Sequence, residues 1–94
     1  MTPQEKLYEA VLHGNVEDIR KAIDEGADVN YRYAEGKTVL HIAVYKEKRR
    51  KIKALLEAGA DTSAVDHCRR TPDFYTVNVN LRRFIMNYGK KGEQ

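Results

Sequence analysis

A repeat of 33 residues is the feature that most constrains how this chain folds. Placed on itself at that offset, the sequence aligns without a gap. The matched positions are Leu7 with Leu40, Ala10 with Ala43, Val11 with Val44, Ile19 with Ile52, and the Gly-Ala-Asp triplets at 26–28 and 59–61. Self-similarity at a fixed period of this size is typical of a stacked array, in which each unit buries its apolar face against its neighbours. The sequence therefore predicts one domain built of similar layers.

Each unit reads as two short helices. In the first unit the apolar residues recur at helical spacing in two successive runs, one from Leu7 to Val11 and one from 16 to 23. Thr2, followed by proline and by Glu5, is typical of a helix start with a capping box. We expect Gly14 to adopt a left-handed backbone in the turn between the helices, and Gly26 to end the second helix.

The later units keep this plan with two changes. The turn at 46–48 of the second unit contains Glu47 and two lysines but no glycine, so we expect it to be held less tightly. The cost is about 1 kcal/mol if a residue there must adopt positive φ. The third unit matches the second only at an offset of 29, so roughly four residues are missing between its helices. Its second helix is still predicted to be amphipathic, from Leu81, Phe84, Ile85 and Tyr88.

Two linked motifs resemble those of ankyrin repeats over about residues 5 to 89. Residues 36–43 read Gly-Lys-Thr-Val-Leu-His-Ile-Ala, and residues 55–61 read Leu-Leu-Glu-Ala-Gly-Ala-Asp. The resemblance implies an all-α solenoid of about three stacked helix-turn-helix units joined by β-hairpin loops, the last being an atypical C-terminal cap. The implied units are 1–33, 34–66 and 67–89, with a tail at 90–94. Loops and inner helices would together form a concave binding face.

Several residues depart from the family pattern. Asp73 stands where the signature has leucine, so we expect Phe74 or Tyr75 to supply the apolar contact. Arg69 stands where Gly36 lies one unit earlier, which predicts a different turn in the second loop. The resemblance also implies a structural role for the signature histidine, His41, as a hydrogen-bonding link between neighbouring loops.

The family's binding positions give the candidate site. Carried over residue by residue, they are Leu12, His13, Ala34, Glu35, Lys37, Tyr45, Lys46, His67, Cys68 and Arg70, flanked by Tyr31, Arg32 and Tyr33. Tyrosine and arginine are frequent in binding hot spots because they bury a large area while keeping a polar group. A cluster of Tyr31, Tyr33 and Tyr45 beside the two lysines would suit a partner with an apolar anchor ringed by acids. The alternative is that these tyrosines only pack on the hairpin.

Enzymatic activity has little support in the sequence. The triplet Asp66-His67-Cys68 contains the residue types of a thiol nucleophile, but adjacent residues in a turn do not normally face one another. One cysteine excludes an internal disulfide framework and disfavours a zinc site, and there is no glycine-rich phosphate loop. We therefore expect a non-catalytic module without a cofactor, monomeric alone, that binds another protein as an adaptor, inhibitor or targeting subunit.

Charge is distributed unevenly along the chain. Residues 1–35 carry eight acids and four bases, a balance of −4, whereas residues 36–94 carry thirteen bases and six acids, a balance of +7. The basic run at 46–53 is by default a solvated surface; an acidic protein surface, or nucleic acid or an anionic membrane, are the alternatives. Nucleic acid is disfavoured because few aromatic residues are interleaved with the bases. Neither a signal peptide nor an apolar run of membrane-spanning length is evident, so we expect a cytoplasmic or nuclear protein.

Overall fold

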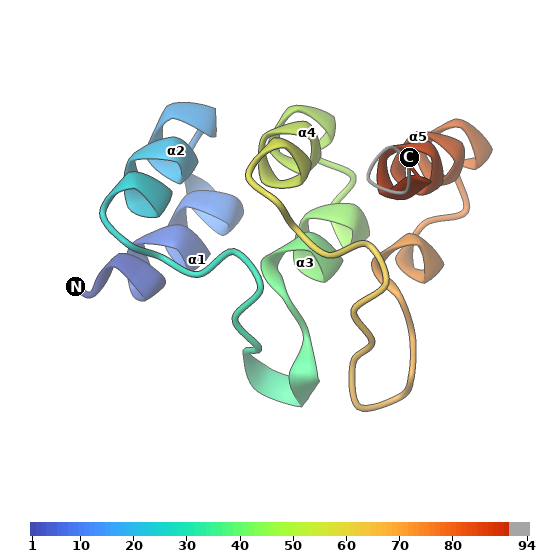
Figure 1. Ribbon diagram of the computed structural model, residues 1–94, viewed down its shortest axis with the longest axis horizontal. Coiled ribbons are helices and arrows are strands. Elements are labelled where there is room, and N and C mark those ends of the chain that lie inside the picture. Colours follow the sequence, from blue (N-terminus) through green and yellow to red (C-terminus); the bar gives the residue numbers. More distant parts are fainter. Residues whose placement is uncertain (91–94) are drawn as a thin grey trace.

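The computed structural model describes residues 1–90, which form two rows of helices with two loops extending from them (Figure 1). The elements are α1 (Pro3–His13), α2 (Val16–Asp24), η1 (Ala34–Gly36), α3 (Val39–Tyr45), α4 (Arg49–Glu57), η2 (Pro72–Tyr75) and α5 (Val79–Lys90). The outer row consists of α2, α4 and α5, and the inner row of α1, α3 and η2. The first loop (25–38, including η1) and the second loop (58–71) extend away from both rows. The three units follow one another along the longest dimension, 34 Å.

One apolar core runs through all three units, as the repeat predicts. Its central side chains are at most 1% exposed: Leu7, Val11, Ile19, Leu40, Ala43, Val44, Ile52, Leu55, Leu81 and Ile85. Full burial of a leucine or isoleucine stabilises a fold by roughly 1.5–3 kcal/mol, so the stacking of successive units supplies most of the stabilisation. Within the described range, no helix has both the length and the apolar character needed to cross a membrane.

The first helix pair confirms the predicted start signal and corrects the predicted turn. The Thr2 hydroxyl accepts a hydrogen bond from the backbone N–H of Glu5, whose carboxylate accepts one from Thr2 N. Gly14, however, has φ −97° and is not left-handed. A Cβ at this position would lie 2.7 Å from the Asp18 carboxylate and 3.0 Å from the Ala10 Cα. Glycine is needed here because the two helices approach closely, and not because of its φ.

The remaining helix ends follow the predictions. Gly26, at φ +111°, and Gly59, at φ +98°, end α2 and α4 in the left-handed region. In the α3–α4 turn, Glu47 adopts φ +53°, which confirms that a residue other than glycine takes the positive-φ position there. The expected cost is about 1 kcal/mol.

The connecting loops correct the expectation of β-hairpins. No strand is present in residues 1–90, and backbone hydrogen bonds join the two arms of each loop only near its tip. They include Tyr33 N to Lys37 O (2.8 Å) and Gly36 N to Tyr33 O (3.1 Å) in the first loop, and Asp66 N to Arg70 O (3.1 Å) and Arg69 N to Asp66 O (2.9 Å) in the second. Other donors in the second loop bond to a side chain instead of a facing arm, since the Asp66 carboxylate accepts from Cys68 N and Arg70 N. A ladder cannot extend where its donors are used in this way.

The second loop uses a different turn from the first, as predicted. Arg69 at φ +61° and Gly36 at φ +74° are both left-handed, but the residues before them differ. Glu35 is also left-handed, at φ +61°, and belongs to η1, whereas its equivalent Cys68 is not left-handed, so the prediction is confirmed. The two loops are joined by a hydrogen bond from His67 N to Glu35 O (2.9 Å).

The third unit is shortened at its first helix, where η2 takes the place of a full helix. Tyr75 is the aromatic residue that packs against the core, whereas Phe74 is 53% exposed. In α5, Leu81 and Ile85 are buried while Phe84 packs at the edge of the core, which confirms the predicted amphipathic helix. Within the predicted tail, residues 91–94 lie outside the described residues.

Candidate partner-binding face

His41 joins the start of α3 to the second loop. Its ring is 1% exposed, and Nδ1 accepts a hydrogen bond from the backbone N–H of Thr38 (3.1 Å). The ring proton therefore lies on Nε2, which donates to the carbonyl of Arg70 (2.9 Å). Burial lowers the pKa of His41, so the ring is neutral at physiological pH. The predicted structural role of this histidine is confirmed.

Two recesses open where the inner row of helices meets the loops. The first recess has a volume of about 690 Å³ and is lined by Met1, Glu5, Tyr8, Glu9, Tyr31, Arg32, Tyr33 and Ala34. The second recess has a volume of about 260 Å³ and is lined by Lys37, His41, Ile42, Tyr45 and Tyr75. Each combines residues of an inner helix with residues of the first loop. We refer to the surface that contains both recesses and the second loop as the inner face.

Three tyrosines form the wall of the first recess. The Tyr33 ring lies 4.9 Å from the Tyr8 ring and 4.9 Å from the Tyr31 ring, centroid to centroid. The Tyr33 hydroxyl accepts a hydrogen bond from the Gln4 side chain (2.6 Å) and donates to the Gln4 carbonyl (3.1 Å). Burial raises the pKa of Tyr33, which keeps the phenol neutral. Tyr33 is thus anchored, while Tyr31 remains 48% exposed.

Some charged side chains at the rim of the first recess already have hydrogen-bond partners within the fold, and others do not. The Glu5 carboxylate belongs to the α1 capping box, and this hydrogen bond lowers its pKa. Arg32 donates to the carbonyls of Gly36 (3.0 Å) and Val65, so its guanidinium holds the two loops together. Glu9 is exposed and forms no hydrogen bond or ion pair with the described part of the chain. Its carboxylate is the free charge of the first recess.

In the second recess the rings already have partners. Lys37 Nζ lies 5.4 Å from the Tyr75 ring centroid and 2.9 Å from the Glu35 carboxylate, and the hydrogen bond to Glu35 raises the pKa of Lys37. The Tyr75 hydroxyl donates to the Asp66 carboxylate, which lowers the pKa of Asp66 to about 2. Tyr45 packs edge-on against Tyr75 at 6.4 Å and is 69% exposed.

The structure divides the predicted site residues among several places. Tyr31, Arg32, Tyr33 and Ala34 line the first recess, and Lys37 and Tyr45 line the second. The tyrosine cluster expected from the sequence is therefore two separate groups. Those outside the recesses are Glu35 at the end of the first loop, His67, Cys68 and Arg70 on the second loop, Lys46 after α3, half-buried Leu12 on α1, and His13 in the groove between α1 and α2.

Several lining residues of the recesses were not among the predicted site residues: Met1, Glu5, Tyr8, Glu9, His41, Ile42 and Tyr75. A signal was present, because the 33-residue offset places Tyr8 at the position of His41 and Glu9 two repeats before Tyr75. Where one unit has an aromatic residue and another has a polar residue at the equivalent repeat position, the two units use that position differently.

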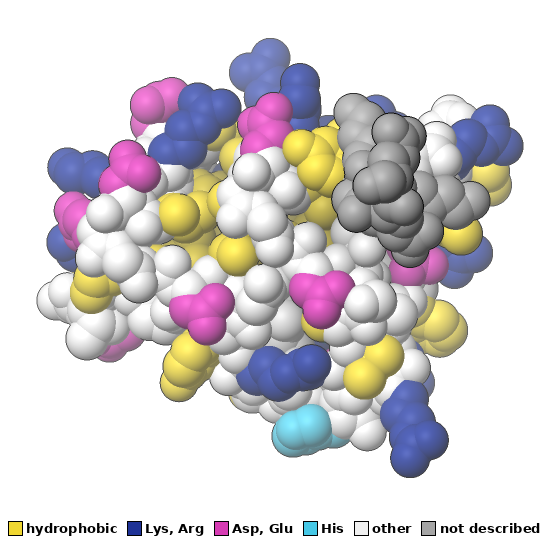
Figure 2. Space-filling view, in the orientation of Figure 1, with side chains coloured by type: hydrophobic (Ala, Val, Ile, Leu, Met, Phe, Trp, Pro, Cys, Tyr) yellow, Lys and Arg dark blue, Asp and Glu magenta, His cyan; other side chains and the backbone are white. Residues whose placement is uncertain are grey.

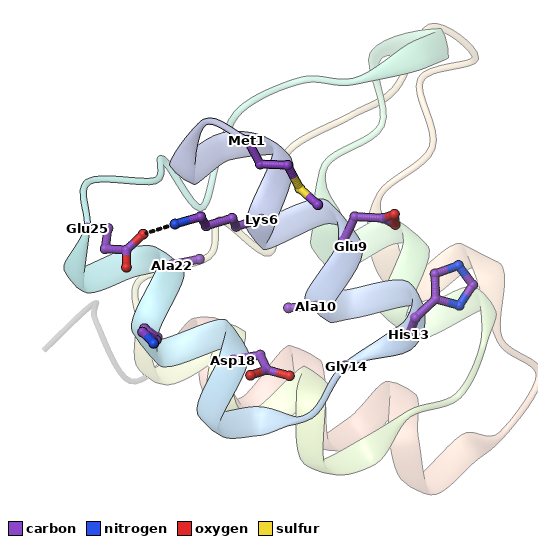
Figure 3. A pocket seen from close by; sticks show the side chains of 10 residues that line it. Met1, Lys6, Glu9, Ala10, His13, Gly14, Asp18, Ala22 and Glu25 are labelled. Atoms are coloured by element: carbon purple, nitrogen blue, oxygen red, sulfur yellow. Dashed lines mark hydrogen bonds and ion pairs between the residues drawn. The ribbon is translucent and has the colours of Figure 1, made fainter.

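The groove between α1 and α2 is the exposed end of the stack (Figure 3). It has a volume of about 400 Å³, and an ion pair between Lys6 and Glu25 (2.9 Å) lies along it. Lys6 and Lys21 occupy the repeat positions of Val39 and Ala54, which are buried where the second unit packs on the first. The groove is therefore a charged counterpart of a repeat-to-repeat contact, and it adjoins the first recess, with which it shares Met1 and Glu9.

A basic surface surrounds the α3–α4 turn. Five of its side chains are exposed and form no ion pair with any described residue: Lys46, Lys48, Arg49, Arg50 and Lys53. Lys51 differs, since its Nζ donates to the carbonyl of Val11 (2.9 Å) and burial lowers its pKa. Figure 2 shows Lys and Arg side chains, in dark blue, projecting beyond the outer row of helices.

The triplet of residues 66–68 is organised around the loop backbone. The buried Asp66 carboxylate accepts from the Cys68 backbone N–H, and the Cys68 side chain is exposed. The ring of His67 lies against Gly36, so close that a Cβ there would be 2.6 Å from it. Residues 1–90 contain no group of three or more His, Cys, Asp or Glu side chains that could hold a metal ion.

Comparison with known proteins gives a consistent result. A family model for ankyrin repeats (3 copies) matches residues 4–89. Ankyrin repeat domain-containing protein 40 of Mus musculus is 36% identical over 83 residues, which is 87% of this chain and 23% of that protein. Putative ankyrin repeat protein FPV219 of Fowlpox virus is 38% identical over 61 residues (65% and 14%), and an L-asparaginase of Dirofilaria immitis is 30% identical over 78 residues (83% and 13%). The chain thus spans less than a quarter of the length of each of these relatives.

Proposed function

Because this chain belongs to the ankyrin-repeat family, whose repeats are generally non-catalytic protein–protein interaction modules, we propose that it binds a partner protein on the inner face. In this role it is an adaptor, an inhibitor or a targeting subunit, and it catalyses no reaction. The observation that carries the proposal is the pair of aromatic recesses between the inner helices and the first loop. Exposed tyrosine on a fixed backbone is the usual composition of a binding hot spot.

Hydrogen bonds between the loops support this choice of face. His67 N bonds to Glu35 O, His41 Nε2 bonds to the Arg70 carbonyl, and the Arg32 guanidinium bridges both loops. Loops that are already fixed lose little conformational entropy when a partner binds. The inner face therefore presents its side chains in one arrangement before the partner arrives.

The test uses the two most exposed tyrosines of the recesses. Tyr31→Ala and Tyr45→Ala are combined in one variant, and the proteins retained on it by affinity capture are compared quantitatively with those retained on the parent. Since a hot-spot residue contributes at least about 1–2 kcal/mol, the affinity of specific partners should fall about tenfold or more. Met86→Ala, which removes an exposed apolar side chain from α5, is the matched control and should retain them. Unchanged retention on the double variant, with circular dichroism showing an intact fold, would refute the inner-face proposal.

A second candidate function follows from the unpaired cations of the α3–α4 turn, through which the chain would bind nucleic acid or an anionic membrane. Such binding weakens steeply and linearly with the logarithm of salt concentration. Charge reversal by Arg49→Glu and Arg50→Glu would abolish it, whereas Tyr31→Ala/Tyr45→Ala would not. Shallow salt dependence with full sensitivity to the tyrosine variant would exclude this second function.

We further propose that the partner is reached in the cytoplasm or nucleus and that residues 1–94 act as a monomeric domain until it binds. Sedimentation of the free protein tests the second statement. A concentration-dependent dimer would contradict it and would make a second copy of the chain a candidate occupant of the inner face.

A further inference from the structure

The repeat places three residues at one equivalent position near the inner face: Gln4, Lys37 and Arg70. In the second unit, Lys37 Nζ lies 5.4 Å from the centroid of the Tyr75 ring. In the third, the Arg70 guanidinium lies 4.9 Å from the Phe74 ring. A cation at either distance is attracted by the negative face of the ring. The two cations therefore come from the second and third units, and both rings come from the third.

The first unit supplies rings without a cation. Its equivalent residue is the neutral Gln4, whose side chain bonds to the Tyr33 hydroxyl and to the backbone N–H of Asp28. Of the two cation–ring pairs in residues 1–90, neither involves Tyr8, Tyr31 or Tyr33. The one arginine at the rim of the first recess, in position 32, is already held by two loop carbonyls.

The first recess also has a carboxylate that no group within the described chain neutralises. Glu9 is exposed at the rim and unpaired. Glu9 also lines the α1–α2 groove, where Figure 3 shows its side chain well apart from the Lys6–Glu25 ion pair. The surrounding segment, residues 1–35, has a balance of −4. The Glu9 carboxylate and the three tyrosine rings therefore both favour a cationic ligand.

Resting on the proposed function, we infer that the first recess binds a lysine or arginine side chain of the partner protein. The alkyl part of the side chain lies against Tyr31 and Tyr33, and its charged end meets the Glu9 carboxylate. A volume of about 690 Å³ accommodates such a side chain with its backbone. An apolar anchor is a poorer occupant, because it would remove water from an ionised carboxylate without replacing the lost hydrogen bonds.

The inference is tested with peptides of known sequence. A random twelve-residue peptide library is selected on the wild-type protein, and each selected peptide is then titrated by fluorescence anisotropy beside versions in which single lysines or arginines are replaced by norleucine. We expect one basic position in the selected peptides at which norleucine weakens binding about threefold to tenfold, the range of one exposed cation–π and ion-pair contact. On Glu9→Gln, the preference for lysine over norleucine should shrink clearly, because only the cation–π contact with the tyrosines remains.

Matched variants separate this inference from the proposed function. Glu47→Gln removes another exposed, unpaired carboxylate, in the α3–α4 turn, and should leave the lysine preference intact. Peptides that lose binding on Tyr45→Ala but are indifferent to Glu9→Gln and Tyr31→Ala would overturn the cation site while leaving inner-face binding in place. Peptides indifferent to all three substitutions, or a library that yields no binder, would overturn both.

Discussion

The first and second recesses lie in successive units of one repeat, yet their aromatic rings are used differently. In the second recess, the Tyr75 hydroxyl bonds to Asp66 and the Lys37 ammonium lies over the ring. In the first, Tyr33 is anchored by Gln4 but the neighbouring Tyr31 is exposed. The same backbone frame therefore holds one set of rings as part of the fold and leaves another set free for a partner.

The strongest test of this difference is the cost of removing a ring from each recess. Tyr75→Ala should destabilise the protein by about 2–3 kcal/mol, because it loses core packing and removes the donor to Oδ2 of Asp66, while Oδ1 keeps its two backbone donors. Tyr31→Ala, at an exposed position, should change stability by less than about 0.5 kcal/mol. Urea unfolding followed by circular dichroism measures both. Equal costs would contradict the division into a structural and a free recess.

The two recesses share the first loop, so a change within it should disturb both. Gly36→Ala places a Cβ 2.6 Å from the His67 ring and 3.2 Å from the His67 backbone nitrogen, at φ +74°. We expect a loss of about 1–2 kcal/mol, from the strained φ and the displaced neighbouring loop together. Gly59→Ala, at φ +98° with open space around it, carries the φ cost alone and should be milder. If Gly59→Ala is the more damaging of the two, the loops are not in the close contact described here.

Lowering the pH should reduce the contribution of the second recess to the stability of the fold more than that of the first recess. The pKa of Asp66 is about 2 in the fold, against an ordinary value of 3.8, chiefly because Tyr75 donates to the carboxylate. Between these values the unfolded chain binds the proton and the folded chain does not, so this stabilisation is present above about pH 4 and is lost as pH falls towards 2. Tyr75→Phe should therefore flatten the fall of stability over that range. Tyr31→Phe is the control, and an unchanged slope in Tyr75→Phe would remove the assigned cause.

The smallest effect on stability is expected when the Lys37 ammonium is removed from the Tyr75 ring in the second recess. Lys37→Gln removes an ammonium whose salt bridge with Glu35 is at the surface, so the denaturation midpoint should hardly move. The ring of Tyr75 would then have no cation over it, and ring signals of Tyr75 in NMR spectra should shift more on titration with butylguanidinium than they do in the parent. Identical shifts in both proteins would show that Lys37 does not occupy that ring in solution.

The sequence predicted those parts of the fold that depend on local rules. The 33-residue period predicted the stacked core, Thr2 and Glu5 predicted the start of α1, and the absence of glycine at 46–48 predicted a strained Glu47. These features depend on the order of neighbouring residues, which the sequence states directly.

Features set by close approach in three dimensions could not be predicted in the same way. Gly14 was assigned a left-handed conformation, but it is required by the approach of α1 to Asp18. Arg69 correctly predicted a different turn in the second loop, but the hydrogen bond from His67 N to Glu35 O that joins the two loops could not be read from the sequence. The separation of Tyr45 from Tyr31 likewise depends on where α3 and the first loop lie in space.

The bridge formed by Arg32 has a consequence for anyone who re-engineers this protein. Its guanidinium donates to a carbonyl in its own loop and to one in the next loop, so neither loop can be replaced without affecting the other. Loop sequences grafted from another repeat would have to be exchanged as a matched pair, or be chosen to retain an arginine in this position. Libraries that randomise residue 32 together with its neighbours would mostly sample misassembled surfaces.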